Sequence, residues 1–321
     1  MVFYLLSLFW LSLWLFGLGV LLSYVMRWWP GDNIISVRFI NYFMPWLLLV
    51  MVPGFVIAWL AHHRGLAATL FTPILLICLA CLPLFLNCSK TAVADGFPIK
   101  VMSYNIWLKN RNMAAAAKLI REEQPDILLL QELGPDNFQD FVDKLNGLYP
   151  DKRLQVDYVP DMNQAIISRY PIESLDADKK KGRAQKVRLE TPFGKFTVFN
   201  IHAYKFRWMR RHRHIATLLQ EDIVTAQDPI ILGGDFNTSD QSQTFRRVKR
   251  YLKNTHWESG CGFGFTFPSS VVRFKGRYPL PALIRIDHIF FSNQFSSRRA
   301  HTLTESGGSD HFPVVAELVI N

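Results

Sequence analysis

Cysteine is scarce in this sequence, with four among 321 residues, and its distribution is uneven. Cys78, Cys81 and Cys88 lie in or next to one apolar run, and Cys261 stands alone in the rest of the chain. So few cysteines exclude a scaffold stapled by many disulfides, and their placement predicts no disulfide within the part of the chain that follows the apolar run. They also leave the redox compartment of the protein open.

Charged side chains are missing from the first 26 residues, and Arg27 is the first to occur. The run 2–26 is long enough to cross a bilayer, and 42–61 and 66–86 are two further uncharged runs. A secretory signal peptide is the alternative for the first run, but it would begin with a basic stretch and would not be followed by two more apolar segments. The sequence therefore predicts three transmembrane helices.

The charges in the connecting loops favour one orientation in the membrane. The first loop carries Arg27 and Arg38 against Asp32, and the second carries Arg64. Lysines follow the third run. Because cytoplasmic loops are enriched in Lys and Arg, this count favours a cytoplasmic position for the first loop and for the C-terminal part, by a small margin.

The chain divides by composition into three parts, and it contains no internal repeat or low-complexity block. Residues 1–88 are predicted to form a membrane anchor, 89–98 a short linker and 99–321 a separate domain. In that domain short apolar strands alternate with amphipathic helices, which indicates an α/β fold whose sheets are buried by helices. Strands are expected at 98–107, 126–133, 163–172, 194–204, 229–237, 283–292 and 313–320, and helices at 113–123 and 213–226.

Polar side chains stand at the ends of the apolar strands of this domain. A single polar residue there is most simply a cap or a turn residue, but the pattern recurs from strand to strand. Ligand sites in α/β folds gather at strand ends, where loops shape a pocket without disturbing the core. The residues concerned are Asn105, Glu132, His202, Asp235, Asn237, Asp287, Asp310 and His311.

These residue types suit one chemistry. Carboxylate and amide oxygens without cysteine favour a hard cation such as Mg²⁺ or Mn²⁺, whereas a zinc site would use more His and Cys. An Asp beside a His, as in Asp310 and His311, can orient and polarise the imidazole. An Asp with a nearby Asn, as in Asp235 and Asn237, can hold and deprotonate a water. Together such groups are suited to attack on a phosphate ester.

Seven motifs carry a family resemblance. They occur in the order "SYNIW", "LLLQEL", "IISRYPI", "FNIHAY", "GGDFN", "RIDHIFFS" and "GGSDHFPVV". In this order they resemble the endonuclease/exonuclease/phosphatase superfamily over residues 99–321, and with the apolar N-terminus they resemble a bacterial membrane-anchored branch of it. Its members include DNase I-like nucleases, apurinic endonucleases, inositol polyphosphate 5-phosphatases and neutral sphingomyelinases. The resemblance implies a four-layer α/β sandwich, in which two mixed sheets pack between helices.

The resemblance also implies a metal site and a position for the attacking water. Glu132 matches the principal metal ligand of the superfamily, and Asn105 matches a second position of the metal site. Asp310 matches a residue close to both the metal and the water. Asp235 matches the residue that aligns or activates the water, with Asn237 beside it.

The remaining matches concern the phosphate and the general base. His202 matches the histidine that contacts the scissile phosphate, and Asp287 matches the acid that pairs with His311. The superfamily pattern leaves open which of Asp235, Asp310 and His311 acts as the base.

A basic stretch, "YKFRWMRRHRHIA" at 204–216, follows the histidine of the "FNIHAY" motif. The plain interpretation is a solvated helix start. Its cations could instead hold phosphates while Phe206 and Trp208 stack on bases, and the same composition also suits an acidic membrane surface. The candidate substrate-binding residues are Gln164, Lys205, Arg207, Trp208, Arg210 and Arg211.

The sequence therefore predicts a membrane-anchored, Mg²⁺- or Mn²⁺-dependent phosphoesterase that cleaves phosphodiesters, with nucleic acid ahead of lipid as the substrate. The formal net charge of +10 suits such anionic partners. A phospholipid or sphingomyelin phosphodiesterase, or a phosphoinositide phosphatase, is the first alternative. A non-catalytic membrane module that binds anionic ligands is an alternative of another class. The expected location is a bacterial inner membrane, and no protein partner is expected.

Overall fold

A computed structural model of the chain describes residues 2–86, 88, 96, 98–150, 154–175, 184–205 and 207–321. The chain divides into two compact units. The helical unit comprises Met1–Phe85 together with Ser239–Arg246, and the sheet unit comprises Leu86–Thr238 and Arg247–Asn321. Most of the predicted linker at 89–98 lies outside the described residues.

Three long apolar helices dominate the helical unit, as the sequence predicts. They are α1 (Val2–Met26), α2 (Ile35–Leu60) and α3 (Arg64–Cys81), and the one-turn helix α4 (Pro83–Leu86) follows. Each of the three is long and apolar enough to cross a membrane. α2 begins earlier than the predicted 42–61 and contains two prolines, with irregular backbone angles at Phe43. Membrane helices tolerate such prolines when neighbouring groups satisfy the freed backbone atoms.

A buried polar cluster joins the loop after α1 to the second segment of the helical unit, in which α8 (Gln243–Val248) begins. The Arg27 guanidinium donates to the backbone oxygen and to Oε1 of Gln241, at 2.9 and 3.1 Å. The carboxylate of Asp32 is fully buried and accepts from Asn41 Nδ2 at 2.6 Å and from the Gln243 amide at 2.7 Å. The helical unit is therefore not built from N-terminal residues alone.

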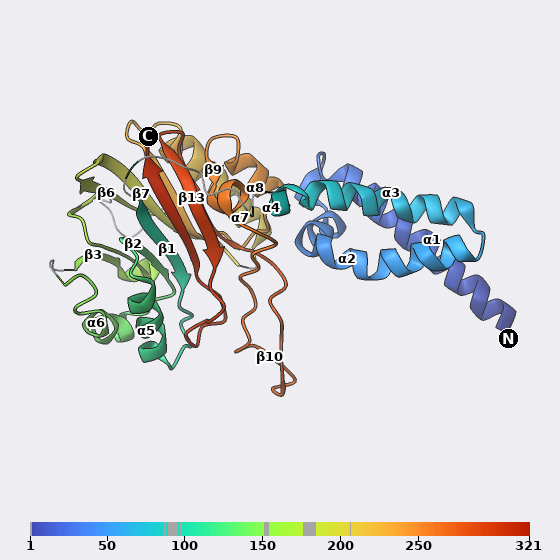
Figure 1. The fold of residues 1–321 in the computed structure, drawn as a ribbon, viewed down its shortest axis with the longest axis horizontal. Helices are drawn as coiled ribbons and strands as arrows, with labels where there is room; N and C mark the ends of the chain where they lie inside the picture. The colour runs from blue at the N-terminus through green and yellow to red at the C-terminus, as the bar shows by residue number, and fades with distance from the viewer. Residues whose placement is uncertain are drawn as a thin grey trace. The chain divides into compact units, whose positions relative to one another are not determined.

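The sheet unit contains two six-stranded mixed sheets, which Figure 1 shows with the strands as arrows. In the first sheet, β1 and β2 run parallel, and the other neighbouring strands pair antiparallel. β1 and β2 are almost entirely buried, as expected of central strands covered on both faces. The order is β13 (Phe295–Thr302), β14 (Val314–Ile320), β1 (Ile99–Asn105), β2 (Ile127–Gln131), β4 (Gln164–Ser168), β3 (Gln155–Val159).

The second sheet has the same mixed pattern, with β7 and β8 as its parallel pair. The strand predicted at 163–172 proves to be two strands, because the chain passes from the first sheet to the second between Ser168 and Ile172. The order is β5 (Ile172–Ser174), β6 (Gln185–Thr191), β7 (Gly194–His202), β8 (Ile230–Asp235), β12 (Asp287–Phe291), β9 (Lys253–Asn254).

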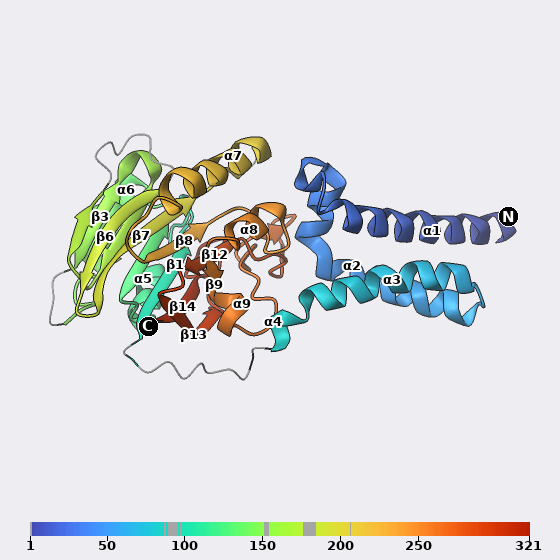
Figure 2. The ribbon, with the colours of Figure 1, turned by 90° about the horizontal axis from the view of Figure 1, so that it is seen from above.

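The two sheets pack face to face through one apolar layer. Ile127 and Leu129 of the first sheet belong to the same buried cluster as Val198 and Ile231 of the second. A second cluster joins the outer face of the first sheet to α5 (Met113–Glu123) and α6 (Pro135–Lys144). α7 (Trp208–Leu218) follows β7 in the chain, and α9 (Thr255–Ser259) packs on β12 and β9 of the second sheet and on β13 of the first, as Figure 2 shows. The predicted sandwich of two mixed sheets between helices is confirmed.

Cys88 and Cys261 form a disulfide within the sheet unit. The sequence predicts no disulfide within 99–321, and the partner of Cys261 is indeed a residue outside that range, at the end of the predicted membrane anchor. The sequence pattern could not reveal the pair, because Cys88 stands next to the third apolar run and 173 residues separate it from its partner. The disulfide joins the chain just after α4 to the loop that follows α9.

Candidate active site

Strand register gathers the polar strand-end residues of both sheets. β1 and β2 are parallel and in register, so Asn105 and Glu132 leave the first sheet side by side. In the second sheet His202 stands opposite Asp235, and Asp235 stands opposite Asp287. Because β12 runs antiparallel to β8, it contributes its first residue where β7 and β8 contribute their last. The register thus places three of the predicted residues in one row.

Glu132 is held in an unusual backbone conformation by several hydrogen bonds. Its φ of 60° lies in the left-handed region, which residues with a side chain seldom adopt. Its Oε2 accepts from the Leu108 amide at 3.1 Å, and its Oε1 accepts from Asn105 Nδ2 at 3.2 Å. Burial opposes ionisation, but these bonds and the adjacent His202 outweigh it, so the pKa of the Glu132 carboxyl lies below its ordinary value.

Asp235 lies at the centre of the site. β7 and β8 approach so closely at Gly234, where φ is 142°, that a Cβ there would overlap the backbone oxygen of Ile201. The Asp235 carboxylate accepts from the backbone amide of Asn237 at 2.8 Å and from its Nδ2 at 3.1 Å. Burial, and after it repulsion from Asp287, raises the pKa of Asp235. A carboxyl with a raised pKa is suited to accept a proton from water.

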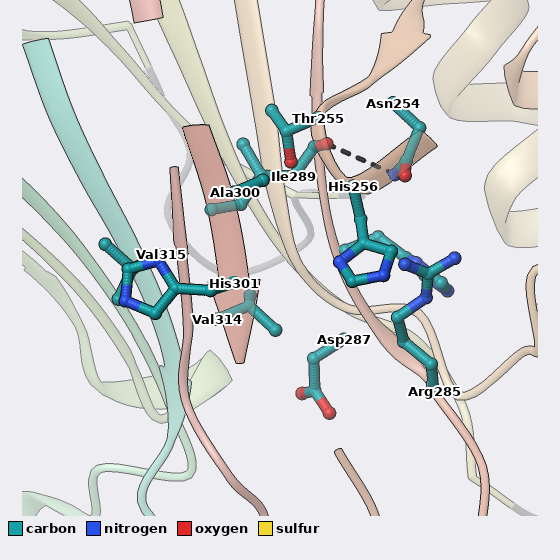
Figure 3. Close-up of a pocket in the computed structure, with 11 residues that line it drawn as sticks. Asn254, Thr255, His256, Arg285, Asp287, Ile289, Ala300, His301, Val314 and Val315 are labelled. Atoms are coloured by element: carbon teal, nitrogen blue, oxygen red, sulfur yellow. Dashed lines mark hydrogen bonds between the residues drawn. The ribbon is translucent and has the colours of Figure 1, made fainter. Parts of the chain in front are cut away.

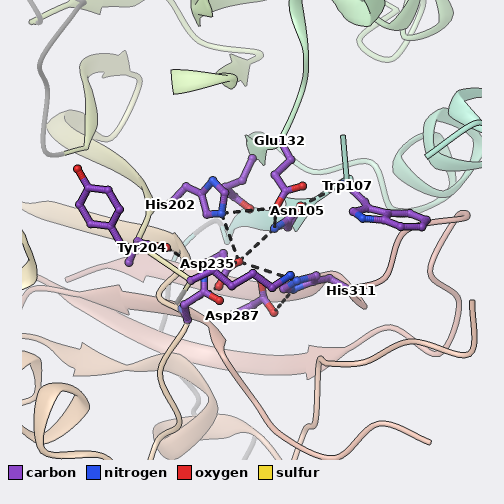
Figure 4. A network of polar contacts seen from close by, with 12 residues as sticks. Asn105, Trp107, Glu132, His202, Tyr204, Asp235, Asp287 and His311 are labelled. Atoms are coloured by element: carbon purple, nitrogen blue, oxygen red, sulfur yellow. Dashed lines mark hydrogen bonds and ion pairs between the residues drawn. The ribbon is translucent and has the colours of Figure 1, made fainter. Parts of the chain in front are cut away.

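His202 stands between two carboxylates, as Figure 4 shows. Its Nε2 lies 3.6 Å from Glu132 Oε1 and 3.7 Å from Asp235 Oδ2. Asn105 Nδ2 bridges the same two residues, at 3.2 Å and 3.1 Å. The His202 side chain is 25% exposed, whereas that of Asp235 is 2% exposed. His202 is therefore the more accessible of these two side chains to a molecule that arrives from solvent.

Asp287 and His311 form a buried hydrogen-bonded pair, as predicted. Asp287 Oδ2 lies 2.9 Å from His311 Nδ1, and each side chain is 1% exposed. Burial opposes the charge on the ring, but the carboxylates of Asp287 and then Asp235 outweigh it and raise the pKa of His311 to about 9. The ring is therefore an imidazolium at neutral pH, and its Nε2 faces Asp235 Oδ2 at 3.9 Å.

Asp310 adds a further carboxylate beside this pair. Its Oδ1 is buried without a hydrogen-bond partner in the described part of the chain, and it lies 3.9 Å from His311 Nε2. Its Oδ2 lies 4.0 Å from Lys205 Nζ. Burial raises the pKa of Asp310, the cations His311 and Lys205 act against this, and the carboxylates of Glu132 and Asp235 reinforce it. A positive charge near these acids would relieve the repulsion among them.

A small pocket is lined by Asp287 together with apolar side chains and several polar ones, and Figure 3 shows these residues. Its volume of about 10 Å³ is enough for one water molecule. His256 and Arg285 line it, and burial together with Arg285 lowers the pKa of His256 to about 3, so that ring is neutral. The pocket is too small for a substrate.

Two groups that the sequence analysis did not single out also hold the site. Ser309 is fully buried, donates its Oγ to the backbone oxygen of Asn105 at 2.6 Å and accepts from the His311 amide at 3.0 Å. The other group is the backbone amide of Leu108, which binds Glu132. Membership of the "GGSDH" motif was the one signal for Ser309, and a backbone amide leaves no signal in a sequence.

Three of the predicted substrate-binding residues are buried. Gln164 is fully buried and donates to the backbone oxygen of Asn200 at 3.0 Å, within the interior of the sheet unit. Trp208 and Arg211 are 8% and 6% exposed, and Arg211 donates to the backbone oxygen of Lys205 at 3.0 Å. In this conformation Gln164 and Trp208 have no exposed face on which a base could stack or a phosphate could bind, and Arg211 holds the basic stretch in shape.

The other three predicted substrate-binding residues, Lys205, Arg207 and Arg210, are exposed. Lys205 lies closest to the carboxylates, because its Nζ is near Asp310 and above the ring of Phe267. Phe206, which was expected to take part in stacking, lies outside the described residues.

A divalent cation fits the oxygen donors at the Glu132 side of the site. Glu132 is ionised, Asp310 offers a buried carboxylate oxygen with no hydrogen-bond partner among the described residues, and the amide of Asn105 lies beside Glu132. Such hard oxygen donors are the ligands that Mg²⁺ and Mn²⁺ take, and no thiol is among them.

A second set of potential ligand atoms, from Asp235, Asp287 and His311, lies within 4.8 Å of one another. We favour the Glu132 side for the cation, because Asp287 and His311 already bind each other and the imidazole carries a proton at neutral pH. A protonated ring nitrogen is not a metal ligand.

Solved structures share this fold at low sequence identity. An endonuclease/exonuclease/phosphatase family protein of Bacteroides thetaiotaomicron is 21% identical, with a TM-score of 0.56, over 71% of this chain and 100% of that chain. A mannosyl-6-phosphatase of the same species is 22% identical, with a TM-score of 0.54, over 69% and 100%. A truncated TDP2 of Caenorhabditis elegans is 20% identical, with a TM-score of 0.55, over 70% and 98%.

No curated protein matches the sequence. Residues 102–311 match the Endonuclease/Exonuclease/phosphatase family. The matched stretch extends from the interior of β1 to His311, so it contains all of the strand-end residues described above. The chain therefore belongs to the Endonuclease/Exonuclease/phosphatase family.

Proposed function

We propose that this protein is a membrane-anchored phosphodiesterase that depends on Mg²⁺ or Mn²⁺. Members of its family are metal-dependent hydrolases of phosphoesters. The observation that carries the proposal is the gathering of Glu132, His202, Asp235 and His311 around one point, where their charged atoms lie 3.6–3.9 Å apart. The pKa of Glu132 is lowered, that of Asp235 is raised, and that of His311 is raised to about 9. An ionised ligand, a base and a proton donor are the groups that phosphate ester hydrolysis needs.

Each side chain then has a role that its contacts support. Asp235, oriented by the two hydrogen bonds from Asn237, positions the attacking water and takes its proton. His311, charged and held by Asp287, donates to a phosphate oxygen as negative charge develops there. His202 is partly exposed and contacts the same phosphate. In this arrangement Asp235 is the base, because His311 already carries its proton at neutral pH.

Glu132, Asn105 and Asp310 would hold the metal. A bound divalent cation neutralises phosphate oxygens and lowers the pKa of water. The Leu108 amide and Asn105 fix the direction of the Glu132 carboxylate, so this ligand is oriented before a cation arrives.

For the substrate, we place lipid-linked phosphodiesters first. The helices α1 to α3 are long and apolar enough to hold the chain at a bilayer, and the burial of Trp208 removes one of the two side chains that were expected to stack on bases. Nucleic acid is the second candidate, and the exposed Lys205, Arg207 and Arg210 near the site favour it. The location that we propose is a bacterial inner membrane.

The test is a substrate panel on the full-length protein in nanodiscs, with Mg²⁺, Mn²⁺ or EDTA. The panel contains a soluble diester, phosphatidylglycerol, sphingomyelin, a phosphoinositide, plasmid DNA and RNA. We expect hydrolysis of the soluble diester and of at least one lipid, abolished by EDTA and restored by Mg²⁺ or Mn²⁺. Cleavage of nucleic acid alone would reverse the order of substrates. Hydrolysis unaffected by EDTA, or no hydrolysis of any compound, would refute the proposed activity.

A further inference from the structure

One segment of the sheet unit supplies none of the catalytic or metal-binding groups described above. Between Ser269 and Leu283 the chain forms a long excursion with the two-residue strands β10 (Arg273–Phe274) and β11 (Tyr278–Pro279) at its tip. Figure 1 shows it projecting away from both sheets. We call residues 269–283 the projecting hairpin.

The exposed surface of the projecting hairpin combines apolar and cationic side chains. Phe274 and Tyr278 are 56% and 59% exposed, although large aromatic side chains are usually much more buried in a soluble domain. Between them stand the exposed cations Lys275 and Arg277, with Arg273 just before. The tip therefore presents aromatic rings and positive charges together.

These cations have no acidic partner among the residues that the structure describes. No acidic residue occurs between Glu258 and Asp287 in the sequence. No carboxylate of the described residues lies within ion-pair distance of Arg273, Lys275 or Arg277. Exposed cations beside exposed aromatic rings fit an anionic phospholipid surface, where Lys and Arg meet the headgroups and aromatic rings settle at the interface.

The stem of the projecting hairpin is bonded to the active site. The Ser269 amide donates to the backbone oxygen of Asp310 at 2.7 Å, and its Oγ donates to the backbone oxygen of Ser309. At the other end, the Leu283 amide donates to the backbone oxygen of Phe267 at 2.9 Å. The ring of Phe267 packs on His311, with 4.9 Å between centroids. A surface that binds the tip is thus connected to the catalytic loop by a short, ordered stretch of chain.

We propose that the projecting hairpin is a docking element for the anionic surface of a phospholipid bilayer. A bilayer is the favoured occupant over a nucleic acid for two reasons. The hairpin carries the exposed aliphatic Val271 beside its aromatic rings, and an aliphatic side chain gains more from the apolar interior of a bilayer interface than from the charged backbone of a nucleic acid. The chain also has three helices that could cross a membrane, which would keep a bilayer at high local concentration.

Amide hydrogen exchange of the full-length protein, measured by mass spectrometry, tests this docking without any assay of hydrolysis. The protein is placed in nanodiscs of phosphatidylcholine and in nanodiscs that contain an equal share of phosphatidylglycerol. In a third sample, vesicles that contain phosphatidylglycerol are added to the protein in phosphatidylcholine nanodiscs, so that docking to a separate bilayer is also detected. We expect exchange of residues 271–280 to slow when phosphatidylglycerol is present in either form.

A triple variant with Arg273, Lys275 and Arg277 changed to Ala supplies the charge test. Each Lys or Arg near an anionic surface strengthens association roughly fivefold, so the variant should lose on the order of a hundredfold in affinity and show no lipid-dependent protection. Arg298 and Arg299 on β13 are also exposed, and their replacement by Ala is the control that removes cations elsewhere on the sheet unit, which should keep the protection.

Equal exchange of the hairpin in all lipid conditions would overturn the proposal. Protection by an added oligonucleotide but not by anionic lipid would assign the hairpin to nucleic acid instead. Because exchange reports docking alone, failure of this proposal is distinguishable from failure of the proposed phosphodiesterase activity.

A different observation carries a second inference, on the side of the membrane. Cys88 and Cys261 form a disulfide in the sheet unit, and disulfides persist in oxidising compartments and not in a reducing cytosol. We infer that the sheet unit lies on the oxidising side of its membrane. The loop charges favour the opposite side, but by a margin of so few residues that the disulfide is the stronger indicator.

Thiol trapping in intact cells tests this inference. After acid quenching and denaturation, a maleimide-polyethylene glycol reagent should modify Cys78 and Cys81 alone, and all four cysteines only after reduction. In Cys261→Ser a third cysteine, Cys88, should react without reduction. A C-terminal alkaline phosphatase fusion, which needs an oxidising compartment, should be active. Reaction of all four cysteines without reductant would overturn the inference. So would an inactive phosphatase fusion together with a bright C-terminal fusion to a fluorescent protein that fluoresces only in the cytoplasm.

Discussion

Asp287→Asn removes the charge that holds the His311 ring in its protonated form. The 2.9 Å contact joins two side chains that are each 1% exposed, so solvent screens it little. The pKa of His311 is raised from 6.5 to about 9, and Asp287 is the strongest attraction that opposes burial. A shift of this size corresponds to about 3 kcal/mol between the charged and the neutral ring. Without that carboxylate, the lowering of the pKa by burial is opposed less, so the pKa of His311 in the variant should fall to about 7 or lower.

The sign of the pH dependence follows from this change. In the wild type the raised pKa of His311 stabilises the fold fully below its unfolded value of 6.5, and this contribution is lost as the pH rises through about 9. If hydrolysis needs the imidazolium, the wild-type rate should also decline near pH 9. In Asp287→Asn the decline should begin near neutrality. At a pH that is alkaline but still below the decline of the wild type, the variant should hydrolyse the diester more slowly than the wild type by about tenfold or more.

The assay is the pH dependence of soluble-diester hydrolysis by full-length protein in nanodiscs at saturating Mg²⁺. Asp228→Asn is the matched control, because Asp228 pairs with Arg188 at 2.8 Å on the surface of the sheet unit. Its profile should coincide with that of the wild type. If Asp287→Asn kept the alkaline limb of the wild type, the role assigned to the charged His311 ring would be refuted.

Three further predictions concern the fold and the basic stretch. Asp32→Ala should lower the thermal stability of the full-length protein, because the N–H groups of Asn41 and Gln243 lose their acceptor. Each unsatisfied donor costs about 1–3 kcal/mol, and an unchanged Tm would contradict this. Gly234→Ala should reduce both the yield of folded protein and hydrolysis, because a Cβ would overlap the backbone oxygen of Ile201. A normal yield would contradict this and show that β7 and β8 can move apart. If the protein binds DNA, Arg210→Ala should reduce the slope of log affinity against log salt concentration by roughly 0.9 and leave the Tm unchanged, because Arg210 is exposed. Arg211→Ala should instead lower the Tm, because Arg211 is buried and hydrogen-bonded. A lower Tm for Arg210→Ala and an unchanged Tm for Arg211→Ala would contradict these assignments.

Much of the site follows from the sequence because of how buried strands are built. Strands covered on both faces are continuous apolar runs, so a polar residue that ends such a run stands out. Asn105, His202 and Asp235 were found in this way, and the register of β7 and β8 then places the last two opposite each other. Asp287 fits the pattern for a different reason, since it begins its strand, and only the antiparallel pairing with β8 explains why it joins the others.

Other features depend on contacts between distant parts of the chain, which periodicity does not record. The sequence of the basic stretch looks uniformly solvated, yet Trp208 and Arg211 turn inward on α7. The disulfide joins Cys88 to Cys261 across 173 residues. The residues after Thr238 belong with the helices, because Asp32 and its neighbours supply buried hydrogen bonds that no local pattern announces.

Paired measurements on Glu132→Gln test the central claim, that a metal bound at Glu132 drives phosphodiester hydrolysis. Mn²⁺ binding is measured by calorimetry, and metal-dependent hydrolysis of the soluble diester is measured on the same full-length samples. Glu122→Gln is the control, because the side chain of Glu122 is 56% exposed on α5. We expect that Glu132→Gln stays folded, binds Mn²⁺ at least about tenfold more weakly and loses hydrolysis by at least about a hundredfold, while the control is unchanged. Near-normal metal binding and turnover in a folded Glu132→Gln protein would contradict it.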